Sequence, residues 1–562
     1  MNIHSHLLPE MQPQKKAGAV DESAVMDNTL SGSFVSRNLP EKLTWLQDAG
    51  MGLFIHWSLD AQLGCVISHT LVGASRDYVE RFYTELPKTL EKGEWDFDHL
   101  ANLAKLCGFQ YAVLTTKHHC GFCLWPSEST DFHVGNTAVG RDLVSEYAAA
   151  FRRKGIKVGF YFSPEDFWFL RKMGLPITRS PKETYPEEIH QAYRAYLKIQ
   201  MEELMDHGPV DVLFFDGGES MTGEDGISLQ QYCMNIAWDY QPDVLITRGA
   251  IPTPEQQLPG VGADQAWEAC ITLGTAWQYQ PTNEIYKTGA HVIRLLVDTR
   301  AKGGALLLNI GPDARGILCR EQENILRELA LWHFINGESV HSVRPWVLVS
   351  EEDEERTIYL LRKKDEDTVY AVIFGEKEWD RGQRRKITLH SVKAGEKTTV
   401  QVLGQSGEET EYRPDLDAHS YFTQEEDRLV IDVMNAQRVY CGIQWRNPLV
   451  LKLTDVHPAF VPMMIKQGES SIYGGEVLLK ANVRDMGSFE SASLRFEYRV
   501  YPGFALSSYD EGWKSTDPVT VKKPGSYETV LDGLSSGVTY QWKAILENRQ
   551  NRMQTEMALF HL

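Results

Sequence analysis

The stretch DVLFFDGG, Asp211 to Gly218, decides the fold of the first half of the chain. Its apolar run, Val212 to Phe215, predicts a strand buried on both faces, as in a parallel sheet that helices cover. Asp216 follows this run, and packing does not account for it, because a buried carboxylate is costly unless it is paired. In a βα barrel the chemistry lies at the carboxyl ends of the strands. Asp216 therefore marks a candidate catalytic rim.

Strands and helices alternate around this stretch, from residue 39 to 346. The predicted strands are 52–55, 111–116, 157–163, 211–216, 243–248 and 305–310, and the predicted helices are 97–107, 142–154, 187–207, 284–302 and 321–334. This alternation predicts βαβ units and a parallel sheet. We expect a TIM-like (β/α) barrel, which needs eight strands, so two must be weak or distorted; 267–272 is a candidate for one. An open doubly wound sheet is the alternative, although no GxGxxG motif supports a dinucleotide site.

After residue 346 the pattern changes to short strands between polar turns. Strands at 357–361, 369–374, 385–389, 398–403, 429–433 and 439–443 predict a β-sandwich over residues 347–447. Strands at 476–483, 493–500, 527–531 and 540–546 predict a second sandwich over 448–562, and its turn before Tyr540 resembles a fibronectin type III module. Residues 1–38 are polar and aperiodic, which predicts a mobile N-terminal arm.

The composition limits the partners and the compartment. The chain has 562 residues and a formal net charge of -20, which argues against nucleic acid or an anionic membrane as partner. No apolar run is long enough for a transmembrane helix. Eight widely spaced cysteines fit free thiols in a reducing compartment. The first residues lack the apolar core of a signal peptide, so we expect a cytoplasmic protein, or a secreted or periplasmic one if a signal has been removed.

Polar side chains end or follow the apolar runs at the same predicted end of the sheet. They are His56, His118, His119, Tyr161, Asp216 and Arg248. A single histidine in such a place is usually structural, but packing does not easily explain six polar groups on one rim. The set predicts a binding or catalytic site there.

The segment TTKHHCGFC, residues 115–123, allows two other chemistries. Two histidines and two cysteines could bind zinc, but adjacent histidines on a strand point to opposite faces, and no second ligand pair follows at finger spacing. Cys120 and Cys123 form a CxxC motif, but its redox chemistry needs the first cysteine at a helix start, and the following LWPS predicts no helix. We expect no metal and no cofactor; a metal-dependent hydrolase using His118 and His119 is the alternative.

Several segments, in order from about residue 41 to 346, resemble glycoside hydrolase family 29, the α-L-fucosidases. They are GLFIHW (52–57), LTTKHHCGFCLWPS (114–127), GRDLV (140–144), GFYFS (159–163), DGG (216–218), TPEQ (253–256), WEACITLGTAW (267–277) and GGALLLNIGPDARG (303–316). The paired histidines together with LLLNIGP make the resemblance specific. The two β regions are only loosely similar to the β-sandwiches that follow the barrel in that family.

The resemblance implies a retaining fucosidase that acts on a fucosylated oligosaccharide or glycoconjugate. Asp216 matches the family's nucleophile, and Glu255 is the best match for the general acid/base, with Glu268 as its competitor. The positions that hold the sugar hydroxyls and orient the nucleophile match His56, His118, His119, Tyr161 and Arg248. Phe54 and Trp277 match apolar positions that pack against the methyl group of the sugar.

The chemistry can also be stated from the residues. Hydrolysis with retention needs two carboxyl groups roughly 5 to 5.5 Å apart, one ionised and one protonated. Asp216 near Arg248 and histidines should stay ionised, whereas a glutamate beside tryptophans can have its pKa raised by desolvation. A pocket with histidines facing aromatic rings suits a deoxy sugar, which has hydroxyls on one side and a methyl on the other.

The sequence departs from the family pattern in three places. Cys120 replaces an acidic residue, Phe214 replaces a tryptophan, and residues 68–83 lack a Glu-Trp pair. The linkage preference and the tolerance of L-galactose therefore stay open. The alternatives are an α-L-galactosidase on the same fold and a sugar-binding protein on a degenerate barrel. Homo-oligomerisation also stays open.

Overall fold

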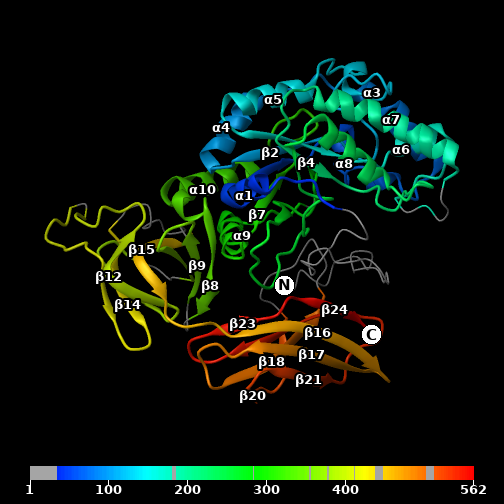
Figure 1. Cartoon of the computed structure of the whole chain (residues 1–562). Helices are drawn as coiled ribbons and strands as arrows, with labels where there is room; N and C mark the ends of the chain where they lie inside the picture. The colour runs from blue at the N-terminus through cyan, green and yellow to red at the C-terminus, as the bar shows by residue number, and fades with distance from the viewer. Residues whose placement is uncertain are drawn as a thin grey trace.

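The computed structural model describes residues 35–179, 181, 185–282, 284–352, 356–375, 379–410, 412–436, 447–501 and 512–562. An α/β domain comes first along the chain, and two antiparallel β regions follow it (Figure 1). Most of the predicted arm and the predicted strand 439–443 lie outside the described residues. Within the described ranges, no helix combines the length and the apolar character needed to cross a membrane.

The α/β domain is built on a parallel sheet of seven strands in the order β5-β4-β3-β2-β1-β7-β6. The strands are β1 (Met51–Ile55), β2 (Tyr111–Lys117), β3 (Lys157–Phe162), β4 (Val212–Phe215), β5 (Leu245–Ile246), β6 (Glu268–Thr272) and β7 (Ala305–Ile310). All their residues except Lys157 are buried, as continuous apolar runs predict. The predicted parallel sheet is therefore confirmed, but β5 has only two residues where the sequence predicted six.

The sheet curls around a core of its own. β1 and β4 lie three places apart in the strand order, yet the ring centroids of Phe54 and Phe214 are 5.0 Å apart. The hydroxyl of Tyr111 on β2 donates to Oε1 of Glu268 on β6 at 2.5 Å. Side chains from all seven strands form this enclosed core. The alternative of an open doubly wound sheet, with helices on both faces, is therefore wrong.

The curled sheet does not close as a regular eight-stranded barrel, because no strand in the described part of the chain joins β5 to β6. Segment 252–256 lies along β6 instead, and Gln256 N donates to Cys270 O at 3.0 Å while Cys270 N donates to Pro254 O at 3.0 Å. Glu268 N also donates to the carbonyl of Pro252 at 3.1 Å. Proline has no N–H, so Pro254 cannot return a bond to the Glu268 carbonyl, and the pairing stops at one bridge.

The outer edge of β5 is paired with a side chain. The amide of Asn38 donates to Ile246 O at 2.8 Å and accepts from Ile246 N at 2.9 Å. The side chain thus satisfies backbone groups that a neighbouring strand would otherwise satisfy. Asn38 is the last residue of the predicted mobile arm, and its contacts connect that residue to the sheet.

The helices of the α/β domain lie around the outside of the curled sheet (Figure 1). They are α1 (Pro40–Ala49), α2 (Arg76–Thr84), α3 (Leu86–Thr89), α4 (Phe97–Cys107), α5 (Leu143–Arg153), α6 (Phe167–Lys172), α7 (Glu187–Met205), α8 (Leu229–Tyr240), α9 (Gly289–Ala301) and α10 (Arg320–Asn336). The helix predicted from residue 284 begins only at Gly289, because Thr288 caps it by accepting from His291 N at 3.2 Å.

The first β region consists of two sheets around one apolar core. One sheet has the order β12-β15-β10-β9-β8 and the other β11-β14-β13. The strands are β8 (Val343–Glu352), β9 (Thr357–Lys363), β10 (Thr368–Phe374), β11 (Arg384–Leu389), β12 (Val392–Val402), β13 (Tyr421–Gln424), β14 (Leu429–Met434) and β15 (Leu449–Pro458). β8 begins before the predicted boundary at 346, and β15 lies after the predicted boundary at 447, yet both pair within this region.

The second region, which we call the C-terminal β domain, also has two sheets around a common core. Its strands are β16 (Met464–Tyr473), β17 (Glu476–Asp485), β18 (Ala492–Val500), β19 (Lys514–Ser515), β20 (Val519–Val521), β21 (Gly525–Leu531), β22 (Thr539–Glu547), β23 (Arg552–Gln554) and β24 (Ala558–His561). The hydroxyl of Tyr540 accepts from Ser535 N at 2.9 Å. The likeness to a fibronectin type III module stays a prediction.

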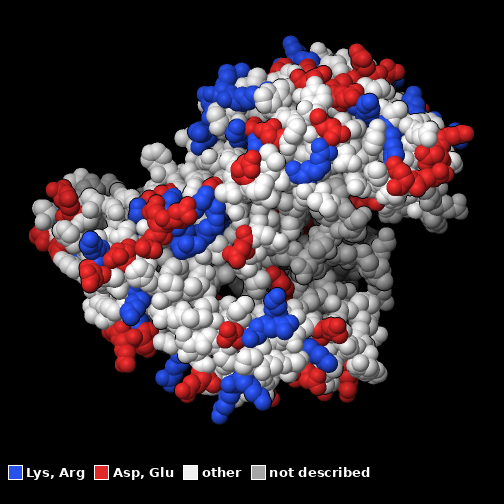
Figure 2. All heavy atoms as spheres, viewed as in Figure 1, with Lys and Arg blue, Asp and Glu red and all other residues white. Residues whose placement is uncertain are grey.

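The charged side chains are mixed over the face shown in Figure 2. Lysines and arginines alternate with aspartates and glutamates on all three parts of the molecule, although the formal net charge is -20. On this face the negative excess is therefore spread over the surface and forms no large patch of one sign.

Candidate active site

Asp216 follows the carboxyl end of β4 and is surrounded by donors. Tyr161 donates its hydroxyl to Oδ2 of Asp216 at 2.8 Å, and Nε2 of His119 lies 3.5 Å from the same oxygen. Nη1 of Arg248 lies 3.4 Å from Oδ1, and Nη2 of Arg179 lies 3.6 Å from it. The side chain is 20% exposed, so a ligand can reach a carboxylate that the protein holds on several sides.

The charges around Asp216 keep it ionised. Burial alone would raise its pKa, but the positively charged Arg179 and Arg248, together with the neighbouring imidazoles of His119 and His118, outweigh burial and hold the pKa of Asp216 well below its usual value. A carboxyl group that must attack as an anion needs this environment.

Glu255 stands on the same rim and is joined to Asp216 through one arginine. Nη2 of Arg248 donates to Oε2 of Glu255 at 2.8 Å, while Nη1 of the same guanidinium reaches Asp216. Glu255 pairs with Cys270 of β6 in the single bridge of segment 252–256. Its side chain is 30% exposed, which leaves it accessible from solvent. The structure therefore brings together the predicted nucleophile and the predicted acid/base.

Glu268 does not lie on the rim with Glu255 and Asp216. It is the first residue of β6, at the amino end of the strand, and it is fully buried. Burial raises its pKa to about 7, and its Oε1 accepts from the hydroxyl of Tyr111. The prediction that Glu268 contacts substrate or competes as acid/base does not fit this position, because the side chain is enclosed in the core below the rim.

His56 borders the apolar side of the site. Its Nδ1 lies 2.5 Å from Oδ1 of Asn309, and its ring centroid is 4.3 Å from that of Phe54 and 5.0 Å from that of Trp277. Burial lowers the pKa of His56 to about 3, so the imidazole is neutral at physiological pH. A neutral imidazole next to two apolar rings can exchange hydrogen bonds with a hydroxyl group without adding charge.

The rings of His118 and His119 lie next to each other, contrary to the prediction that they point to opposite faces of a continuous strand. β2 ends at Lys117, so the strand alternation no longer applies, and the two ring centroids are 4.3 Å apart. Ser68 Oγ lies 2.8 Å from Nδ1 of His118, and Ser163 Oγ lies 2.6 Å from Nδ1 of His119. Burial lowers the pKa of both histidines well below the usual value.

A third histidine, His69, adjoins this pair. It begins a short 3₁₀ helix, His69–Leu71, and its ring centroid is 6.0 Å from that of His118 and 5.5 Å from that of His119. Ligand nitrogens of the three residues lie within 4.8 Å of one another. Three imidazoles of this kind could bind a zinc ion. The alternative of a metal-dependent hydrolase would therefore use His69 together with His118 and His119. His69 was not predicted as a site residue, because it follows no apolar strand.

The CxxC motif does not form a redox site. Cys120 and Cys123 are both free and buried. Burial raises the pKa of Cys120 to about 12 and that of Cys123 well above its usual value. Both thiols therefore stay protonated and unreactive at neutral pH, as small apolar side chains.

An ion pair between Arg179 and Glu165, which was not predicted, lies next to Asp216. Nε of Arg179 donates to Oε2 of Glu165 at 2.7 Å, and Gly218 N donates to Oε1 of Glu165 at 3.2 Å. A Cβ atom at Gly217 would lie 2.4 Å from Cδ of Glu165, which explains the glycine after Asp216. Glu165 follows β3 at the rim and fits the pattern of polar strand ends. Arg179 lies in a coil segment 14 residues after Glu165, and no pattern in the sequence indicates it.

Glycoside hydrolases use two carboxyl groups beside the glycosidic bond, and the arrangement of Asp216 and Glu255 on Arg248 is compatible with that class. A family model described as alpha-L-fucosidase matches residues 22–338. The chain belongs to the α-L-fucosidase family.

Individual relatives agree with this membership. Tissue alpha-L-fucosidase of Mus musculus is 27% identical over 409 residues, which cover 67% of this chain and 86% of the mouse protein. Alpha-L-fucosidase isoenzyme 1 from Paenibacillus thiaminolyticus has a similar structure, with a TM-score of 0.57 and 28% identity, covering 74% of this chain and 98% of that one. A GH29 alpha-L-fucosidase from Bacteroides thetaiotaomicron, in a structure of a trapped covalent intermediate, is similar in fold, with a TM-score of 0.58 and 21% identity, covering 76% of this chain and 99% of that one.

Proposed function

We propose that this protein is a retaining exo-glycosidase that releases terminal α-L-fucose from fucosylated oligosaccharides or glycoconjugates. The observation that supports it best is the pair of carboxyl groups on Arg248, with Asp216 held ionised and Glu255 accessible. The names of the curated relatives and the family model favour fucose as the sugar.

In the first step Asp216 attacks the anomeric carbon, while Glu255 donates a proton to the glycosidic oxygen of the leaving group. The C–O bond breaks, and fucose becomes covalently linked to Asp216. In the second step Glu255 takes a proton from water, the water oxygen attacks the anomeric carbon, and Asp216 leaves as a carboxylate. The covalent intermediate trapped in the Bacteroides thetaiotaomicron fucosidase is consistent with this route.

The sugar is held by its two unlike sides. The neutral histidines His56, His118 and His119 bind hydroxyl groups, and Phe54 and Trp277 pack against the methyl group at C5. L-galactose carries a hydroxymethyl group at that carbon. We expect its extra hydroxyl group to meet apolar rings and to stay without a partner there, which favours fucose over L-galactose.

We further propose that the catalytic domain is a TIM-like barrel in which segment 252–256 occupies the eighth place. Its bridge with β6 and its position beyond β5 support this interpretation. Glu255 is then presented by the one wall of the barrel that is not a regular strand. The domain limits and the cytoplasmic location stay predictions.

The proposal is tested with the purified full-length chain and aryl α-L-fucosides. Turnover whose first product, followed by NMR, is α-L-fucose supports retention; β-L-fucose as first product contradicts it. The aryl α-L-galactoside serves as the comparison substrate and should give a lower kcat/KM. Binding of free fucose in calorimetry without turnover of any glycoside would support the sugar-binding alternative instead.

A further inference from the structure

The chain that follows Glu255 leaves the catalytic rim and contacts the C-terminal β domain within two residues. Gln257 is 7% exposed. Its Nε2 donates to the hydroxyl of Tyr501 at 2.6 Å, and its Oε1 accepts from Nε2 of Gln541 at 3.3 Å. Oε1 of Gln541 in turn accepts from Arg499 at 2.9 Å. A buried chain of hydrogen bonds therefore links the loop that follows Glu255 to strands β18 and β22.

A second set of contacts holds the same loop three residues further on. Gly260 N donates to Oε2 of Glu556 at 2.8 Å, and Gly260 O accepts from Nε2 of Gln554 at 2.6 Å. A Cβ atom at Gly260 would lie 2.6 Å from the carbonyl oxygen of Thr555. The backbone of the loop thus lies directly against the backbone of the C-terminal β domain.

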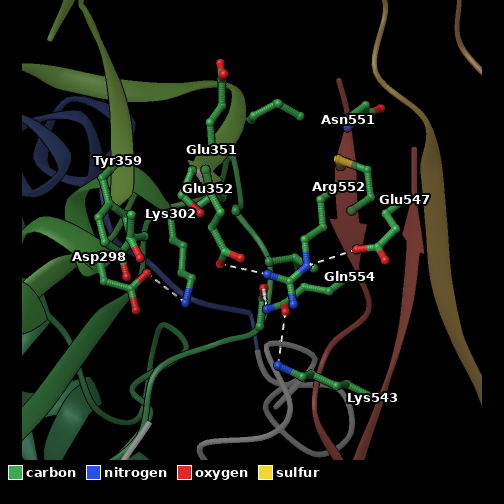
Figure 3. Close-up of a pocket in the computed structure, with 18 of the residues that line it drawn as sticks. Asp298, Lys302, Glu351, Glu352, Tyr359, Lys543, Glu547, Asn551, Arg552 and Gln554 are labelled. Carbon is green, nitrogen blue, oxygen red and sulfur yellow. Dashed lines mark hydrogen bonds and ion pairs between the residues drawn. The ribbon is translucent and has the colours of Figure 1, made fainter. Parts of the chain in front are cut away.

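The loop also borders a cavity of about 420 Å³ between the α/β domain and the two β regions. Figure 3 shows Asp298 of α9 and Lys302, the residue after α9, on one side of this cavity and Glu547 and Arg552 of the C-terminal β domain on the other. Residues 257, 258 and 260–262 are part of its lining. The loop has open space on this side. It is also held by the α/β domain, because Leu258 packs in the main hydrophobic core and Ala263 N donates to Lys302 O at 2.9 Å. The contacts of Gln257 and Gly260 with the C-terminal β domain are the second set that holds it.

On its other side Glu255 is attached to the curled sheet. Besides the single bridge with Cys270, Oε1 of Gln256 accepts from Oγ1 of Thr272 at 3.1 Å. Glu255 therefore lies between an attachment to β6 and an attachment to another domain. Shifts of about 1 Å in a catalytic group can change rates about 100-fold.

From these contacts we propose that the C-terminal β domain positions Glu255 for proton transfer, with Gln257 as the positioning residue. The inference rests on the proposed role of Glu255 as general acid/base. A general acid matters most when the leaving group is a poor one, because an activated aryl leaving group departs without a proton. Loss of positioning should therefore appear as a dependence on the leaving group.

The experiment compares Gln257→Ala and Tyr501→Phe in the full-length chain, on a fucosylated disaccharide and on 2,4-dinitrophenyl α-L-fucoside. For each variant we expect kcat/KM to fall roughly tenfold on the disaccharide, because general acid catalysis contributes about 10²- to 10⁴-fold and only part of it is lost. On the dinitrophenyl substrate the change should stay within about twofold, since the nucleophile is untouched. Tyr473→Phe is the matched control, because it removes a hydroxyl group from a tyrosine of the same domain that is 66% exposed.

Equal losses on both substrates, or no loss on either, in a Tyr501→Phe protein that melts like the wild type would overturn the inference. Gln257→Ala removes two buried hydrogen bonds, so Tyr501→Phe is the deciding variant if Gln257→Ala does not fold. Glu255→Gln is measured beside them. If Glu255→Gln itself shows no dependence on the leaving group, the proposed acid/base fails; if it does and the Tyr501 variant does not, only the positioning role fails.

Discussion

Arg248 donates to Glu255 at 2.8 Å, and the same guanidinium reaches Asp216 at 3.4 Å. A planar guanidinium can contact two carboxylates at once, whereas an ammonium group is a single point charge. The arginine therefore sets the relative position of the two groups that retaining hydrolysis requires.

The Arg248→Lys variant should lose about 100-fold in kcat, because lysine cannot hold both carboxylates and removing one fixed donor from a site typically costs that much. The measurement is kcat and KM on an aryl α-L-fucoside, with circular dichroism as the control for folding. Wild-type kcat in Arg248→Lys would show that the bridge is dispensable.

Replacing the nucleophile should abolish turnover. The Asp216→Ala variant should lose roughly a thousandfold or more in kcat and keep its fold, because the covalent step needs this carboxylate. Added azide should partly restore turnover and give β-L-fucosyl azide, since azide enters the space that the carboxylate leaves. Full activity in Asp216→Ala would remove this residue from the mechanism.

Matched amide variants distinguish the role of Glu255 from that of Glu268. We expect Glu255→Gln to lose about 10²- to 10⁴-fold on a fucosylated disaccharide and much less on a dinitrophenyl fucoside. Glu268→Gln should keep activity on both, because its side chain is buried at the amino end of β6. The reverse pattern would make Glu268 the acid/base.

Glu268 should also govern part of the pH dependence of stability. Its pKa is raised to about 7 in the folded chain from 4.5, so the unfolded chain releases this proton first, and stability is lost as pH rises from about 4.5 to 7. The Glu268→Gln variant cannot ionise and keeps an oxygen for Tyr111. At pH 8 its free energy of unfolding should therefore exceed that of the wild type by up to about 3 kcal/mol, which is measured as a higher Tm. At pH 4 the two proteins should differ little. A gain that is the same at both pH values would refute this assignment.

A chelator distinguishes a sugar-binding from a metal-binding role of the histidine cluster. We expect kcat on an aryl fucoside to be unchanged after treatment with EDTA, because Asp216 and Glu255 supply the chemistry. Activity that EDTA abolishes and zinc restores would favour a metal on His69, His118 and His119. The variant His69→Ala, treated in parallel, would then fail to recover with zinc.

Strands β1 to β4 and β7 were predictable because each is a continuous apolar run between clear breaks, and the rim followed from the polar residues that end or follow such runs. β5 is shorter than predicted, and β6 was only a candidate strand. His118 and His119 were correctly placed on that rim, but the contact between their rings was not predicted, because it depends on β2 ending at Lys117. Arg179 was not predictable, since its contact with Glu165 joins a coil segment to the end of β3. Gln257 was missed for the same reason, because its partners lie more than 200 residues away in the chain.

Because Pro254 has no N–H, the segment that carries Glu255 can change in length more easily than the strand that precedes Asp216. A residue inserted into a regular strand turns every later side chain to the other face of the sheet, so the position of Asp216 after β4 tolerates no such change. Segment 252–256 pairs with β6 at one bridge only, and its length is not bound to the register of the sheet. Insertions or deletions before Glu255 can therefore occur without turning the side chains of the strand that places the nucleophile.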